Sequence, residues 1–133
     1  MRTYTITARR DDANGSMAGV REGLVVLDTS LAGRADALNP VELLLASLAA
    51  CMMKGVERSA PMLKFGFSGV TVSLSAERQD APPKLTAITY ELVVDTDESD
   101  HRLELLHTNV RKYGTISNTL AESVALTGVV RRG

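Results

Sequence analysis

The chain has 133 residues, which is the size of one domain, so we expect a single domain over residues 1–133. Its 15 basic and 16 acidic residues give a formal net charge of −1 and are spread along the chain, so we expect neither nucleic acid nor a membrane as a partner. The only cysteine, Cys51, excludes an internal disulfide, and without paired Cys or His spacing we expect no metal and no cofactor.

The N-terminal region has the pattern of a β-hairpin. Residues 3–8 alternate polar and apolar side chains, which predicts a strand. Asn14-Gly15 is a hairpin signal, and residues 17–28 follow as one strand or as two that are interrupted near Gly23. The early charges do not fit the apolar centre of a signal peptide, so we expect a cytoplasmic protein.

The strongest helix signal begins at Asn39. Asn39 is a favourable N-cap, and Pro40 lies where a missing N–H is not needed. Glu42 comes three residues after the cap, where its carboxylate can return to the backbone as in a capping box. We therefore predict a helix start at this point.

The body of this helix is apolar on almost every side. Residues 43–53 contain no charge, so other elements or a second subunit must enclose them. The run is too short for a membrane span, which needs about 20 residues, and is typical of a buried core helix. We expect the helix to end near residues 59–60, because Pro61 disfavours helical geometry in the residue before it.

The C-terminal half separates strands from helices. Residues 69–78 and 86–94 alternate and predict two neighbouring strands, the second with Ile88, Tyr90, Leu92 and Val94 facing the core. The segments that follow are, in order, a helix over 101–113 closed by Gly114 as a C-cap, a short helix over 115–123 and a strand over 126–132. This order predicts the α+β class.

Two motifs in this order resemble the OsmC/Ohr family of osmotically induced and organic hydroperoxide resistance proteins. They are NPVELLLASLAAC, starting at Asn39, and KYGTISNTLAESV, starting at Lys112, and the resemblance extends over most of the chain. It implies an α+β fold in which antiparallel sheets wrap around two central helices and two chains intertwine as a homodimer.

The resemblance also implies a chemistry. In the family's peroxidases a cysteine of the first helix attacks the peroxide, and a second cysteine then forms a disulfide with it. Cys51 matches the attacking position, whereas Gly114 stands where the second cysteine would be, so the chain resembles an OsmC-like branch that lacks this residue. If the two positions are neighbours, Gly114→Cys should form a disulfide with Cys51 after peroxide treatment.

Two further catalytic candidates follow from the resemblance. The hydroperoxide-resistance members have Glu directly after the Pro of NP, but here Val41 has that place and Glu42 follows it, so Glu42 is either a catalytic residue or only a capping residue. Thiolate formation in an apolar helix also requires a nearby cation. Arg10 is the best counterpart of the family's arginine, with Arg9 and Arg21 as alternatives.

The candidates for substrate contact are Met52, Tyr113, Gly114, Ser117 and Asn118. Their simpler interpretations are core filling for Met52 and helix capping for the others. Two functions remain open. One is a thiol-dependent hydroperoxide reductase that uses Cys51 and an external thiol reductant. The alternative is a dimer without peroxidase activity that binds a small apolar ligand.

Overall fold

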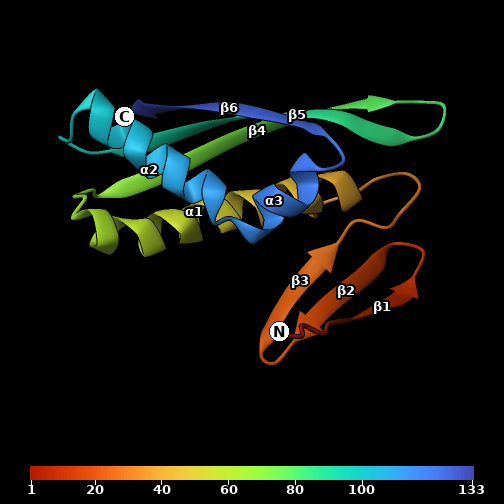
Figure 1. Ribbon diagram of the computed structural model, residues 1–133. Helices are drawn as coiled ribbons and strands as arrows, with labels where there is room; N and C mark the ends of the chain where they lie inside the picture. Colours follow the sequence, from red (N-terminus) through yellow and green to blue (C-terminus); the bar gives the residue numbers. More distant parts are fainter. The chain divides into compact units, whose positions relative to one another are not determined.

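The computed structural model describes all 133 residues and divides into two compact units, residues 1–44 and residues 45–133. Each unit has a three-stranded sheet of its own (Figure 1). The helices and strands together confirm the predicted α+β class. That residues 1–133 form a single domain stays a prediction.

The sheet of the first unit is an antiparallel meander of β1 (Thr7–Asp12), β2 (Gly15–Val20) and β3 (Gly23–Leu27). The hairpin at Asn14-Gly15 and the interruption near Gly23 are confirmed. β1 begins four residues later than the alternation predicted and continues through the charged residues up to Asp12. All of its side chains are exposed, so pairing with β2 sets its bounds rather than burial of one face.

The long helix α1 (Pro40–Leu63) starts as predicted and ends later. The amide of Glu42 donates to Asn39 Oδ1 at 2.9 Å and the amide of Asn39 donates to Glu42 Oε1 at 3.0 Å, which completes a capping box. The predicted end before Pro61 is wrong, because Pro61 is inside the last turn of the helix. The chain instead leaves the helix at Lys64, whose φ is +52°.

This C-terminus of α1 is a Schellman motif without glycine. The amide of Phe65 donates to the carbonyl of Ala60 at 2.8 Å, and the amide of Lys64 donates to the carbonyl of Pro61 at 3.3 Å. Phe65 and Ala60 are both buried, which adds the apolar contact that often accompanies the motif. A left-handed lysine gives no sequence signal of the kind that Gly does, so sequence reasoning placed the end too early.

The second unit contains a mixed sheet and two further helices. Its elements are, in chain order, β4 (Gly69–Gln79), β5 (Lys84–Asp95), α2 (Asp100–Lys112), α3 (Thr115–Ala121) and β6 (Ala125–Arg132). β4 and β5 form the predicted antiparallel hairpin, but β6 runs parallel to β5, so this sheet is not purely antiparallel. The reason is the crossover through α2 and α3, which returns the chain to the end of the sheet where β5 began (Figure 1).

The apolar core lies in the second unit. Ile88, Tyr90, Leu92 and Val94 of β5 are 2% exposed or less, as their alternation predicted. They form one buried cluster with residues from the two long helices, namely Leu48, Met52 and Val56 of α1 and Leu103, Leu106 and Val110 of α2. Both helices therefore pack on the same face of the sheet.

Tyr90 requires a glycine beside it in the sheet. Gly128 of β6 is its registered partner, and a Cβ on Gly128 would lie 2.5 Å from three atoms of the Tyr90 ring. Tyr90 is fully enclosed, so its ring has no free space into which it can move.

We therefore expect Gly128→Ala to lower the free energy of unfolding by about 1–3 kcal/mol, the usual cost of overpacking a core. Urea denaturation measures this change. Gly69→Ala in β4 is the matched control, since its Cβ would meet only the end of the exposed Asp95 side chain, which can rotate away. Equal losses for the two variants would contradict the role assigned to the Tyr90 ring.

Candidate functional site

The thiol of the protein opens on a hollow of about 260 Å³ in the second unit. Its wall is formed by one face of α1 and by the chain segment that links α2 to α3. The lining residues are Ser47, Ala50, Cys51, Lys54 and Arg58 of α1, together with Tyr113, Thr115 and Ile116. Cys51 itself is a free, half-buried cysteine.

Two cations lie along the same helix face as the thiol. Lys54 follows Cys51 by three residues and Arg58 follows Lys54 by four, which is the spacing of neighbours on a helix surface. Neither cation forms a salt bridge. The Arg58 guanidinium lies 5.8 Å from the centroid of the Tyr113 ring, as in a cation–π contact, and Lys112 Nζ lies 5.4 Å from the same ring.

Positive charges beside an accessible thiol are typical of reactive cysteines. Neither Lys54 nor Arg58 was predicted from the sequence, because the family resemblance pointed to an arginine near the N-terminus. The available signal was their helical spacing from Cys51, which places the three residues on one face of a single helix.

The candidates for substrate contact divide between the hollow and the core. Tyr113 lines the hollow, but Met52 is fully buried in the apolar core and is not among the lining residues. Asn118 Nδ2 donates to the carbonyl of Lys112 at 3.1 Å and so joins the end of α2 to α3, in agreement with the capping interpretation. Ser117 is buried, and its hydroxyl has no hydrogen-bond partner.

Gly114 is not the C-cap of α2 that the sequence predicted. Tyr113 caps α2, and Gly114 is the N-cap of α3 with a φ of −82°, so no left-handed geometry demands a glycine. A Cβ at position 114 would instead lie 2.9 Å from the carbonyl oxygen of Val110 and 2.9 Å from Ser117 Oγ. The backbone of α2 therefore closes this position to any side chain.

This closure bears on the disulfide expected in Gly114→Cys. The chain neighbours of Gly114, Tyr113 and Thr115, share the hollow with Cys51, which supports the proximity of the two positions. Yet a cysteine at 114 has to displace the end of α2 before its sulfur can reach any partner. The disulfide stays a prediction, with a steric cost added.

We expect Gly114→Ala to lower the free energy of unfolding by about 1–3 kcal/mol, because the neighbour that must move is a backbone carbonyl. Thermal and urea denaturation measure the loss. Gly66→Ala provides the control, since its Cβ would have only the Glu98 carboxylate within contact, at 3.9 Å. If Gly114→Ala is as stable as Gly66→Ala, position 114 is open and the closure described above is wrong.

The two remaining catalytic candidates belong to the first unit. Glu42 holds the start of α1 through the capping box, which is its simpler interpretation. Arg10 lies on β1 and lines a hollow of about 390 Å³ with residues of the 29–32 loop. Of the alternatives, Arg9 pairs with Asp11 at 3.1 Å, and Arg21 is at the β2–β3 turn with a φ of +56°. A role for Glu42 or Arg10 at the thiol stays a prediction.

A partly buried polar cluster lies between α2 and the sheet. Arg111 NH1 donates to the Tyr90 hydroxyl oxygen at 3.1 Å, and the same hydroxyl is hydrogen-bonded to His107 Nε2. Because a guanidinium only donates, the Tyr90 O–H is free to donate to His107, whose own proton then lies on Nδ1, 4.0 Å from a Glu104 carboxylate oxygen. A neutral His107 fits this arrangement of donors and acceptors.

Burial lowers the pKa of His107 from its ordinary value of 6.5; Glu104 opposes this shift and Arg111 adds to it. The unfolded chain then binds a proton more readily than the folded one. The free energy of unfolding should therefore fall as the pH drops through about 6.5 and level off below the pKa of the folded state. Urea titrations between about pH 7.5 and 5.5 measure this slope. His107→Gln should flatten the dependence of the unfolding free energy on pH, whereas the control His101→Gln, at an exposed histidine, should leave it unchanged. The same slope in both variants would contradict the role assigned to His107.

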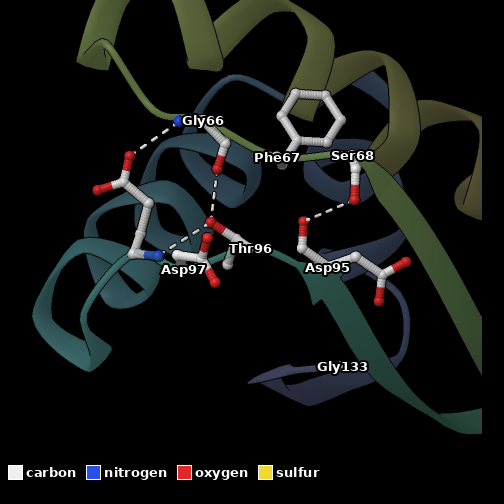
Figure 2. Close-up of a pocket in the computed structure, with 8 residues that line it drawn as sticks. Gly66, Phe67, Ser68, Asp95, Thr96, Asp97 and Gly133 are labelled. Atoms are coloured by element: carbon white, nitrogen blue, oxygen red, sulfur yellow. Dashed lines mark hydrogen bonds between the residues drawn. The ribbon is translucent and has the colours of Figure 1, made fainter.

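A third hollow, of about 530 Å³, lies where the α1–β4 and β5–α2 connections meet (Figure 2). Its polar groups bind one another: the Gly66 amide donates to Glu98 Oε2 at 2.8 Å, and the Thr96 hydroxyl donates to the Gly66 carbonyl. The Gly66 amide, and after it Arg102, lower the pKa of Glu98. No group of acidic, His and Cys side chains in the chain is arranged to hold a metal ion. The hydrogen bonds of Glu98 and Thr96 to Gly66 join the β5–α2 connection to the α1–β4 connection.

None of the helices combines the length and apolar character that crossing a membrane requires.

The sequence model of the OsmC-like protein family matches residues 33–127. No curated protein shows significant sequence similarity to the chain.

Solved structures with the same fold cover nearly the whole chain. The OsmC-like protein from Mycoplasma pneumoniae is 20% identical, with a TM-score of 0.89 over 98% of this chain and 97% of that one. The organic hydroperoxide resistance protein OsmC from Legionella pneumophila is 20% identical, with a TM-score of 0.72 over 98% of each chain. The organic hydroperoxide resistance protein OhrB of Bacillus subtilis is 21% identical, with a TM-score of 0.67 over 98% of each chain.

Proposed function

The chain belongs to the OsmC-like family, and we propose that it is a stress-response enzyme of this family, a thiol-dependent reductase of organic hydroperoxides in which Cys51 reacts. The names of the Legionella and Bacillus proteins, which share its fold, point to hydroperoxides as the substrate class. A homodimer and a cytoplasmic location stay predictions. Exposed apolar side chains on the sheet of the first unit, such as Leu24, Val25 and Val26, support association with a second copy.

Two cations that form no salt bridge line the same hollow as the only thiol, and this observation supports the proposal. A hydroperoxide reaction places negative charge first on the attacking sulfur and then on the departing oxygen. Lys54 and Arg58 line the same hollow as Cys51, so their positive charge is available to stabilise the departing alkoxide. A purely apolar ligand, the alternative occupant, gains nothing from two cations in its site.

The proposed reaction has an oxidative half and a reductive half. The Cys51 thiolate attacks the outer oxygen of the hydroperoxide, the O–O bond breaks, and the alkoxide takes a proton and leaves as an alcohol. Cys51 is then a sulfenic acid. An external thiol condenses with it to form a mixed disulfide and water, and a second external thiol releases Cys51 and leaves as the oxidised reductant.

Trapping of the sulfenic acid tests this proposal. We expect the folded protein treated with cumene hydroperoxide and dimedone to gain one dimedone adduct, which mass spectrometry assigns without ambiguity because Cys51 is the only cysteine. The adduct should form at least about tenfold faster than in the urea-unfolded chain, since only the folded state brings the cations to the thiol.

Two controls accompany this experiment. The Cys51→Ser variant should give no dimedone adduct. Oxidation of methionine to its sulfoxide also adds oxygen, so the mass shift of the methionine peptides measures non-specific oxidation. If the folded protein reacts no faster than the unfolded chain, Cys51 is an inert helix residue and the proposal fails.

A further inference from the structure

The C-terminal end of α2 is attached to β5 through a single hydroxyl group. Both hydrogen bonds between α2 and β5 meet on the Tyr90 oxygen, one from Arg111 NH1 and one shared with His107 Nε2. We propose that this attachment is a pH-sensitive switch, in which protonation of His107 detaches residues 107–113, the α2 end, from β5. Tyr113 belongs to this segment and lines the hollow of about 260 Å³, so detachment also loosens one wall of that hollow.

The Tyr90 hydroxyl depends on His107 as its acceptor. Tyr90 is 2% exposed, so its hydroxyl has almost no access to water. The Arg111 guanidinium can only donate to the hydroxyl oxygen, which leaves His107 Nε2 as the acceptor for the Tyr90 proton. A buried donor that loses its acceptor destabilises the closed arrangement.

Protonation of His107 removes this acceptor. An imidazolium donates from both ring nitrogens, so Nε2 would direct an N–H at an oxygen that already accepts from Arg111, and the Tyr90 proton would have no partner. The new charge would also repel the Arg111 guanidinium, which lies 5.7 Å from the centroid of the Tyr90 ring. The closed arrangement therefore disfavours the charged histidine.

The surrounding charges do not reverse this effect. Burial is the largest influence and lowers the pKa of His107, Arg111 lowers it further, and Glu104 raises it. The Glu104 carboxylate is 4.0 Å from His107 Nδ1, but its side chain is 67% exposed, so water screens the attraction. The α3 helix has no charged residue, and α1 approaches α2 through the uncharged Gly55 and Ser59. The charges of β5 and β6 near this region pair elsewhere, namely Glu91 with Arg131 and Arg132 with Asp100.

The other end of α2 has attachments that contain no histidine. Arg102 NH2 donates to the carbonyls of Leu63 and Lys64, and Asp100 pairs with Arg132 at 2.8 Å. These contacts keep the start of α2 in place at a pH where His107 is charged. The opening is therefore local to residues 107–113, which distinguishes it from a general loss of stability.

Amide hydrogen exchange measures this local opening. Exchange of residues 107–113 is followed at about pH 7.5 and about pH 5.5, with correction for the intrinsic exchange rate at each pH. A histidine in the open state has the ordinary pKa of 6.5, so acidification should lower the protection of the α2 end by up to about tenfold. Addition of about 1 M urea should leave this exchange unchanged, because a local opening exposes little new surface.

Two variants identify the groups of the switch. His107→Gln keeps an uncharged side chain whose amide oxygen can accept from Tyr90, so it should remove the pH response. Tyr90→Phe removes the shared hydroxyl and should lower the protection of the α2 end already at about pH 7.5. The matched control is His101→Gln, which replaces the only other histidine, an exposed one, and should keep the wild-type response. If circular dichroism shows Tyr90→Phe to be unfolded, the two histidine variants decide.

The outcomes are distinct. A fall in protection that His107→Gln removes and His101→Gln keeps supports the switch, whether or not Cys51 reacts with hydroperoxides. Equal protection of residues 107–113 at both pH values overturns it, as does an unchanged pH response in His107→Gln. Exchange that accelerates with urea as steeply as that of the buried β5 also overturns it, because the α2 end would then open only by global unfolding.

Discussion

The close contact between α1 and α2 is the constraint on which the thiol site depends. Gly55 of α1 has no side chain, and a Cβ there would lie only 3.1 Å from Val110 Cγ1 of α2. One turn further along α1, the buried Ser59 hydroxyl donates to Asn109 Oδ1 at 2.6 Å. Small residues thus let the two helices approach, and the hydrogen bond fixes their register. Because Cys51 lies one turn before Gly55, this contact also determines what faces the thiol.

Much of the fold was accessible from local sequence signals. The capping box at Asn39 and Glu42 and the alternation of β5 depend on neighbours in the chain, and both predictions are confirmed. The late end of α1 and the parallel pairing of β6 depend on something else. The first needs a left-handed Lys64, and the second needs the packed position of α2 and α3, so no local pattern predicts either.

The candidate site, like the fold, was predictable from the sequence only in part. The first motif selected the thiol of Cys51, and the second motif selected the segment that contains Tyr113; both line one hollow. Lys54 and Arg58 were not selected, although their spacing along α1 was visible in the sequence, because the resemblance pointed to an arginine near the N-terminus. The interpretation of Gly114 as a C-cap failed for a different reason. The close approach of the Val110 carbonyl, and not the backbone angle, requires the glycine.

The closed position at Gly114 and the open hollow at Cys51 have a common physical origin. Without a side chain at 114, α3 starts immediately after the end of α2, and the Asn118 side chain ties the two helices together. This tight junction puts Thr115 and Ile116 on the wall of the hollow, where a chain with a second cysteine would need room for sulfur. The same glycine that leaves this position without a second thiol therefore also shapes the wall of the hollow beside Cys51.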